Sequence, residues 1–473
     1  MAVGVLAANL ALKLHDIAAQ SLWGDEALTL FVGQQPLSLV RLYTYDTTPP
    51  LYYLLSFAWM RLFGFDLIHL RAFSTILSAL TAVAILLYGR RFLDLPTGVL
   101  AALLFTFSAI HFYYAQEARS YALVGVLCVA SFYVFGLVLE RPSGARLVAL
   151  TGLDALLLYA HFVAGFALAA QLAASWLVAR RREVWLWIAG AEMAALVLLA
   201  PWLAFVVAHW PPAASSWLVA PKPGDIRYVL KTFAGSSLAL ALYGFILGIC
   251  WLRCRSGPGF RTRTRQQMTV LLLWAFLPIV LDYVISQRLP MFLHRYLLYT
   301  SLGLFLCVAA SLTTSDLPHI VQASAIVTVL EVSLVDFVAH PIHRPDWQRA
   351  VALVRADRPE VRRSQASEPP IVVAPWADCK AFAYYFDRDA FTDYAHLYER
   401  LERENVLCSD DPADAVRAHA AADRWILLAS GRRRKADGEA VAALLGRNYT
   451  RIQDDSLDGV AVSLFAADMA ARR

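Results

Sequence analysis

The sequence predicts a mainly α-helical membrane protein, with about eleven transmembrane helices followed by a small C-terminal α/β domain. Hydrophobic residues make up 59% of its 473 residues and charged residues 17%, against roughly 45–50% and about 25% in soluble domains. The apolar residues gather in long runs up to residue 340, whereas residues 341–473 are charged and interrupted by polar loops. This composition excludes a disordered chain, a collagen and an ordinary cytosolic enzyme. A formal net charge of +5 is too small to indicate a nucleic-acid partner.

The predicted spans begin at the N-terminus. A transmembrane helix needs about 20 apolar residues, and residues 1–19 form a first, short span that Lys13, His15 and Asp16 interrupt. This segment lacks the basic leader of a signal peptide, so we expect no cleaved targeting peptide. The further spans are expected at residues 67–89, 96–113, 120–140, 147–161, 162–179, 184–208, 228–252, 268–286, 296–313 and 319–340.

The arginines orient these spans, because short cytoplasmic loops are enriched in Lys and Arg. Alternate loops hold Arg90, Arg91, Arg141, Arg146, Arg180, Arg181, Arg182, Arg253, Arg255, Arg261, Arg263 and Arg265. We therefore place these loops in the cytoplasm. The opposite, extracytoplasmic side then holds the segments 20–66, 114–119, 209–227 and 287–295.

Residues 341–473 are expected to form a second, extracytoplasmic domain after a transmembrane catalytic domain of residues 1–340, because the number of spans is odd. Short apolar runs bounded by turn residues predict strands, and amphipathic stretches predict helices. The expected strands are 371–375, 425–430 and 459–467, and the expected helices are 381–386, 410–422 and 437–448. Cys379 and Cys408 lie in this domain, and a disulfide between them would suit an extracytoplasmic compartment.

Two polar clusters lie in the first extracytoplasmic loop. Asp25 and Glu26, in the motif SLWGDEALTLF, follow the first span directly, and a carboxylate pair at a membrane edge could act as a general base toward an acceptor hydroxyl. The alternative is that Asp25 caps the helix that follows. Asp46 precedes Pro49 and Pro50 and an aromatic amphipathic stretch. This stretch could lie in the membrane interface near a lipid substrate or serve only as an aromatic belt.

Two further clusters stand at the outer ends of later spans. Glu117, Arg119 and Tyr121, in HFYYAQEARSYA, could bind a sugar hydroxyl and a phosphate, or Glu117 and Arg119 could form a structural ion pair. His294, Arg295 and Tyr296 open a span from the outside. The planar guanidinium of Arg295 suits a phosphodiester, although an interfacial arginine can also extend simply toward water.

His161, in LYAHFVAGF, lies at the outer turn between two short spans. A lone histidine is more often a packing residue than a ligand. We keep it as a candidate substrate-binding residue because its turn lies on the same side as the other clusters.

In this order the clusters resemble the GT-C glycosyltransferases, especially the branch that contains protein O-mannosyltransferases and the bacterial aminoarabinose transferase of lipid A. The resemblance covers residues 20–315 and the start of the tail. The matching motifs are LWGDEALT, TTPPLYYLL, LRAFS, YAQEARSYAL, YAHF, HRYLLY and RPDWQRAV.

The resemblance implies a polyprenyl-phosphate sugar donor, used on the extracytoplasmic face with inversion at the anomeric carbon. It implies that Asp25 is the catalytic base, with Glu26 as its usual neighbour, and that Glu117, Arg119 and Arg295 belong to the site. Thr48 departs from the family pattern, in which His or Lys often precedes the motif PPL. The need for a divalent metal is therefore left open, and no other cofactor is expected.

The sequence thus predicts an inverting glycosyltransferase of a bacterial cytoplasmic (inner) membrane. Its expected partners are a polyprenyl-phosphate-linked sugar, membrane lipid and an acceptor glycan, lipid or protein. The alternatives are a transporter or flippase of a lipid-linked substrate and a non-catalytic scaffold whose tail binds a partner. A transporter should show repeats with broken helices and ionisable residues deep in its spans. Here no repeat appears, and the polar clusters gather on one side.

Overall fold

The structure, a computed structural model, forms two compact units. It describes residues 1–34, 48–179, 181–209, 218–256, 262–314, 317–339, 342–363, 369–393, 396–418, 424–430, 434–446 and 449–467. The first unit comprises residues 1–15, 37–63 and 69–342. The second comprises residues 16–36, 64–68 and 343–473. The N-terminal segment 16–36, which carries Asp25, therefore belongs to the same unit as the C-terminal domain.

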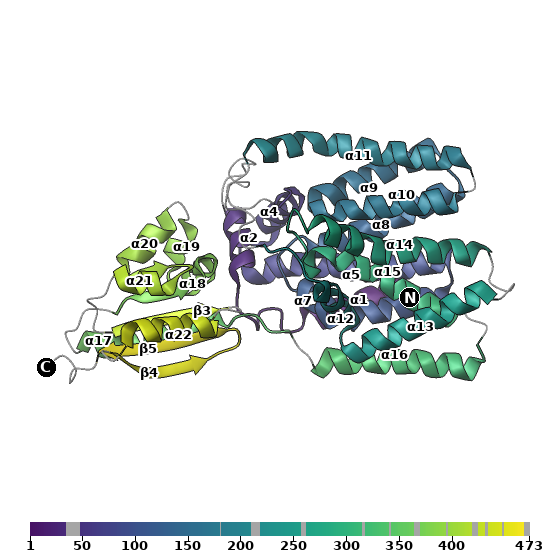
Figure 1. The fold of residues 1–473 in the computed structure, drawn as a ribbon. Helices are drawn as coiled ribbons and strands as arrows, with labels where there is room; N and C mark the ends of the chain where they lie inside the picture. The colour runs from purple at the N-terminus through teal and green to yellow at the C-terminus, as the bar shows by residue number, and fades with distance from the viewer. Residues whose placement is uncertain are drawn as a thin grey trace. The chain divides into compact units, whose positions relative to one another are not determined.

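The first unit is a bundle of helices whose longer members run in roughly one direction (Figure 1). Its core contains one large apolar cluster, with buried polar and charged side chains such as Lys13, Arg71 and Asp154 among the helices, and helix α15 is buried along nearly its whole length. The helices are α1 (Ala2–Leu14), α4 (Leu51–Phe63), α5 (Leu67–Phe92), α6 (Leu95–Thr106), α7 (Ala109–Ala115), α8 (Tyr121–Glu140), α9 (Gly144–Ala160), α10 (Gly165–Val178), α11 (Arg182–Ala208), α12 (Pro223–Ala234), α13 (Ser237–Ser256), α14 (Thr262–Ile285), α15 (Leu298–Thr313) and α16 (His319–Ala339), with 3-10 turns η1 (Phe162–Ala164) and η2 (His294–Leu297).

Within the described residues, six helices are long and apolar enough to cross a membrane, or up to eight if each of two bent pairs forms one span. The bent pairs are α6 with α7, at 68°, and α12 with α13, at 90°. Helix α1 has 13 residues, about 20 Å at 1.5 Å per residue, which is shorter than a hydrocarbon core of about 30 Å. The structure thus confirms a helical membrane protein, while the number of eleven spans stays a prediction.

Close contacts between neighbouring helices depend on glycine. A Cβ atom added to Gly89 of α5 would lie 2.4 Å from Cα of Gly98 in α6, and one added to Gly303 of α15 would lie 2.9 Å from the Trp274 ring of α14. Small residues let membrane helices approach closely, where lipid gives no hydrophobic driving force for their association. The bundle is therefore held by local shape as well as by its apolar composition.

The second unit contains a five-stranded sheet with the strand order β2-β1-β3-β5-β4. Strand β1 is parallel to β2 and β3, whereas β5 is antiparallel to β3 and β4. The strands are β1 (Ile371–Ala374), β2 (Val406–Cys408), β3 (Arg424–Ser430), β4 (Tyr449–Ser456) and β5 (Val460–Ala467). The helices are α2 (Gly24–Gln34), α17 (Trp347–Arg363), α18 (Cys379–Phe386), α19 (Arg388–Thr392), α20 (Leu397–Arg403), α21 (Pro412–Ala418) and α22 (Arg434–Leu445), with the 3-10 turn η3 (Trp376–Asp378).

The expected strands correspond to β1, β3 and β5, and the expected helices to α18, α21 and α22. Strands β2 and β4 were not expected from the sequence. Cys379 and Cys408 form a disulfide, which joins the start of α18 to the end of β2. This part of the chain is a small α/β domain, as predicted.

Candidate functional site

Most of the site residues predicted from the sequence come together in one cluster of the helical bundle. We call it the aromatic–guanidinium cluster. It comprises Tyr53, Tyr114, Glu117, Arg119, Tyr121, His161, Tyr228, His294, Arg295 and Tyr296. Except for Tyr228, which lies in the middle of α12, these residues lie near helix ends or in short turns, where the chain leaves one helix and enters the next.

Arg119 lies in the turn between α7 and α8. Its Nη1 donates a hydrogen bond to the hydroxyl of Tyr53 at 2.6 Å, and its Nη2 donates to Oγ1 of Thr48 at 3.4 Å. The guanidinium also lies 5.9 Å from the centre of the Tyr53 ring. Thr48, directly before the motif PPL, thus contacts Arg119.

The turn η2 supplies His294, Arg295 and Tyr296 to the cluster. The hydroxyl of Tyr114 lies 3.3 Å from Nε2 of His294, and the ring of Tyr228 lies 5.6 Å from the His294 ring. The guanidinium of Arg295 lies 5.6 Å from the centre of the Tyr296 ring. Aromatic rings on several sides thus hold this turn against α7 and α12.

Tyr121 connects the two arginines. Its phenol interacts electrostatically with Arg295, Arg119 and Glu117, and its ring lies 4.9 Å from that of Tyr114. Glu117 is fully buried. Both guanidinium groups therefore belong to the aromatic–guanidinium cluster, and arginine is the side chain best suited to a phosphate.

His161 packs within the cluster rather than apart from it. It ends α9, and its ring lies 4.6 Å from that of Tyr296 and 6.3 Å from that of Tyr121. The backbone amide of Val163 donates a hydrogen bond to Nδ1 of His161 at 3.3 Å. Because Nδ1 accepts, the neutral ring carries its proton on Nε2, which can donate to a ligand.

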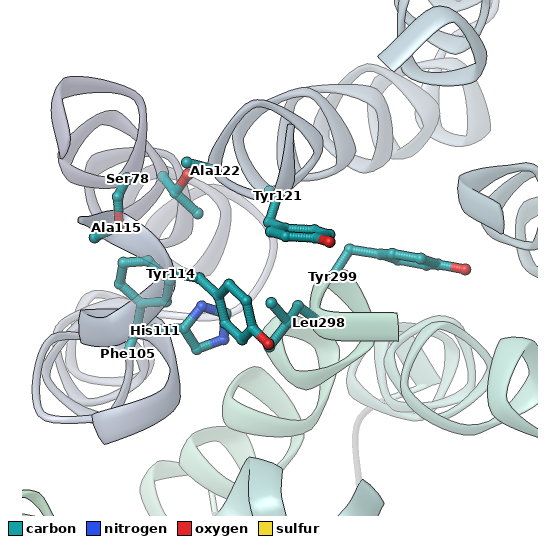
Figure 2. A pocket seen from close by; sticks show the side chains of 11 residues that line it. Ser78, Phe105, His111, Tyr114, Ala115, Tyr121, Ala122, Leu298 and Tyr299 are labelled. Carbon is teal, nitrogen blue, oxygen red and sulfur yellow. The ribbon is translucent and has the colours of Figure 1, made fainter. Parts of the chain in front are cut away.

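A small cavity lies inside the bundle beside this cluster. Figure 2 shows Tyr114, Tyr121, His111 and Ser78 among the side chains around it. Its volume of about 20 Å³ is enough for about one water molecule. The cavity is therefore too small for a sugar.

Asp25 and Glu26 lie in the second unit, in the first turn of α2. Helix α2 begins at Gly24, so Asp25 lies within the helix and is not its N-cap residue. Asp25 is half-buried, whereas Glu26 is fully buried. The two neighbouring carboxylates therefore have different surroundings.

Glu26 faces a buried arginine of the same unit. Its Oε2 lies 3.9 Å from Nε of Arg344, whose side chain is only 1% exposed. A buried charge is costly unless a partner of opposite charge lies near it. The contact joins the motifs LWGDEALT and RPDWQRAV, and it gives Glu26 a role in holding α2 in place.

Further contacts fix this N-terminal segment to the C-terminal domain. The hydroxyl of Tyr385 accepts a hydrogen bond from the amide of Leu22 at 2.8 Å, and the hydroxyl of Ser21 donates to Asp346 at 3.0 Å. Asp378 is a neighbour of Asp25 that the sequence did not single out.

Of the other predicted residues, Asp46 lies outside the described part of the chain. Tyr53, Tyr114 and Tyr228 were missed in the bundle, and Arg344 and Asp378 in the second unit. Within the residues that the structure describes, no group of three or more His, Cys, Asp or Glu side chains could hold a metal ion.

The chain is a helical membrane protein with a small C-terminal α/β domain, and solved structures show that it shares the fold of the GT-C glycosyltransferases. Neither a protein-family model nor the sequence of a curated protein matches the chain.

Solved structures show the likeness. ArnT from Cupriavidus metallidurans bound to undecaprenyl phosphate is similar with a TM-score of 0.55 and 12% identity, over 98% of this chain and 97% of that one. The oligosaccharyltransferase of Archaeoglobus fulgidus has a TM-score of 0.54 and 12% identity, over 99% of this chain and 74% of that one. The same oligosaccharyltransferase, AglB, in complex with an inhibitory peptide and a dolichol-phosphate gives 0.54 at 11% identity with the same coverage.

Proposed function

We propose that the protein is an inverting glycosyltransferase of a bacterial cytoplasmic membrane. It moves a sugar from a polyprenyl-phosphate donor to a hydroxyl or phosphate of an acceptor glycan, lipid or protein on the extracytoplasmic face. The observation that carries this proposal is the cluster in which Arg119 and Arg295 lie among aromatic side chains, in a chain with the GT-C fold. The similar ArnT structure is bound to undecaprenyl phosphate, which supports the donor class.

The proposed roles follow from charge and protonation. Arg119 and Arg295 bind the donor phosphate and stabilise the negative charge that grows on its oxygen as the sugar leaves. The acceptor oxygen attacks the anomeric carbon, its proton passes to the carboxylate of Asp25, and the bond from that carbon to the phosphate oxygen breaks. Polyprenyl phosphate is the leaving group. One displacement of this kind inverts the anomeric centre.

His161, His294, Glu117 and Tyr296 supply polar and aromatic groups for the sugar and the phosphate. Nε2 of His161 is a donor in the neutral ring, as derived above, and the carboxyl of Glu117 can accept from a sugar hydroxyl. Asp46, in the loop before Pro49, is kept as a further candidate for binding.

The test uses the purified full-length protein and a panel of undecaprenyl phosphates linked to a hexose or a pentose, with release of undecaprenyl phosphate as the readout. Membrane glycolipids and peptides with Ser and Thr serve as acceptors. Asp25→Asn should lower the rate by roughly 10²- to 10⁴-fold, the usual contribution of a general base, while the protein still folds. Asp16→Asn, in the same unit but outside α2, is the matched control.

Three outcomes would contradict the proposal. They are turnover of Asp25→Asn at the wild-type rate, the absence of turnover with every donor, and a product in which the anomeric configuration is retained. Movement of the intact donor across vesicles without cleavage would instead support the transporter alternative.

A further inference from the structure

A second carboxyl group lies beside Asp25, and no motif of the sequence indicates it. Asp378 is the last residue of the turn η3, directly before Cys379 and α18. The disulfide between Cys379 and Cys408 holds this position to the end of β2. Asp378 therefore lies directly beside a covalent link within the C-terminal domain.

Gly24 shows how closely Asp378 approaches α2. A Cβ atom added to Gly24 would lie 3.0 Å from Oδ1 of Asp378 and 3.2 Å from the carbonyl oxygen of Ala377. Contacts this short mean that a side chain at residue 24 would require Asp378 or Ala377 to move by a few tenths of an ångström. The glycine before Asp25 therefore allows the carboxyl of Asp378 to reach the first turn of α2.

The groups around Asp378 come from three elements. Ser430 of β3 donates a hydrogen bond to Oδ2 of Asp378, Lys380 of α18 contributes a positive charge, and Asp25 of α2 contributes a negative one. Burial raises the pKa of Asp378 to about 6; the charge of Asp25 adds to the rise, while Ser430 and Lys380 oppose it. The carboxyl group of Asp378 therefore changes its charge at a pH of about 6.

We propose that Asp378 is a positioning residue for Asp25: its carboxyl lies against Gly24, the residue before Asp25, and its negative charge acts on the reaction through the first turn of α2. This inference rests on the proposed function, in which Asp25 is the base. A negative charge on Asp378 favours transfer of the acceptor proton to Asp25, since a like charge nearby favours the neutral form of a carboxyl group. Transfer is therefore faster when Asp378 is ionised.

The first test measures the carboxyl titration by infrared spectroscopy of the full-length protein, independently of turnover. The wild-type spectrum minus that of Asp378→Asn should contain one carboxyl that titrates near pH 6. Asp25→Asn should move this titration to lower pH, because it removes the neighbouring negative charge. Ser430→Ala should move it to higher pH, because it removes a hydrogen bond to the charged form.

Asp393→Asn is the matched control in the same unit. The hydrogen bond from His396 holds the pKa of Asp393 below its usual range, so this exposed carboxylate stays charged from pH 5 to pH 8. Its replacement should leave the band near pH 6 unchanged.

The second test compares transfer rates of the wild type and Asp378→Asn from pH 5 to pH 8. The ratio of the two kcat values should be close to one at pH 5 and should rise through pH 6 to about threefold to tenfold at pH 7.5. The KM for the donor should not change. If Asp378→Asn does not fold, the pH–rate profiles of the wild type and Ser430→Ala provide the test. The increase of kcat with pH should occur at higher pH in Ser430→Ala than in the wild type.

The inference is overturned if Asp25→Asn leaves the titration of Asp378 in place, or if the rate ratio is independent of pH. Either result would leave the proposed function intact as long as Asp25→Asn abolishes transfer. If Asp25→Asn keeps transfer while the infrared band moves, the proposed function is wrong and the coupling of the two carboxyls stands.

Discussion

Arg119 and Arg295 reach the aromatic–guanidinium cluster from turns that are far apart in the sequence. The motifs YAQEARSYAL and HRYLLY identify both turns because a charged residue at the end of an apolar span is unusual. The same reasoning misses Tyr53 and Tyr114, since tyrosines near a membrane interface are common. The roles of these tyrosines depend on the helices that pack beside them, and a local sequence pattern does not predict these neighbours.

At this scale we predict that Arg119→Ala and Arg295→Ala each weaken binding of undecaprenyl phosphate by about 10- to 100-fold. A hydrogen bond to a charged group contributes about 1.5–3 kcal/mol, and each substitution removes one such donor. Native mass spectrometry or quenching of tryptophan fluorescence measures the affinity. Arg182→Ala, at the exposed start of α11, is the control and should bind normally. Equal affinity in all three variants would contradict the phosphate assignment.

Glycines determine how closely some helices of the bundle approach one another. The apolar runs predict where α5 and α6 lie, but the contact between them depends on Gly89 facing Gly98 across a short turn. Asp94 begins α6 by accepting a hydrogen bond from the amide of Thr97 at 2.7 Å, so the turn that brings the two glycines together is itself defined by the sequence.

At the element scale we predict that Gly98→Ala destabilises the bundle by about 1–3 kcal/mol, the usual cost of overfilling a packed site. The new methyl group would lie 2.5 Å from the carbonyl oxygen of Leu86, so α5 and α6 must separate. Thermal unfolding in detergent measures the change. Gly190→Ala in α11, where an added Cβ meets no atom within 4 Å, should be neutral or slightly stabilising.

The strands that the sequence misses share a physical cause. Strand β4 (YTRIQDDS) is largely exposed and forms an edge of the sheet, so its polar residues give no apolar alternation. Strand β2 has three residues, too few for any period. Buried strands such as β3, by contrast, are continuous apolar runs that stand out from a polar tail.

At the scale of the whole molecule, composition and arginine positions predict a membrane protein with an extracytoplasmic tail, and the disulfide between Cys379 and Cys408 agrees with that side of the membrane. The sequence did not predict that each of the two units is built from segments that are separated along the chain. Ser21, Leu22 and Glu26 give no local signal that their partners lie more than three hundred residues away.

We predict that Cys379→Ser destabilises the C-terminal unit by about 3–4 kcal/mol, the loop-closure entropy for a sequence separation of 29 residues. Denaturant unfolding measures the loss, with the reduced wild-type protein as the control for the free thiols. In intact cells a membrane-impermeant maleimide should label Cys408 in this variant. Labelling only after the membrane is permeabilised would place the domain in the cytoplasm and contradict the predicted topology.

The discontinuous second unit also affects the order of events during translation. Residues 16–36 leave the ribosome early, yet the side chains that they contact, from Arg344 to Phe391, are synthesised only after the whole helical bundle. Contacts between such distant residues form late and slowly. In the nascent chain, the segment that carries Asp25 therefore lacks these contacts until synthesis is nearly complete. A truncated chain that ends after α16 would have a complete helical bundle, but its proposed catalytic base would not be held in a fixed position.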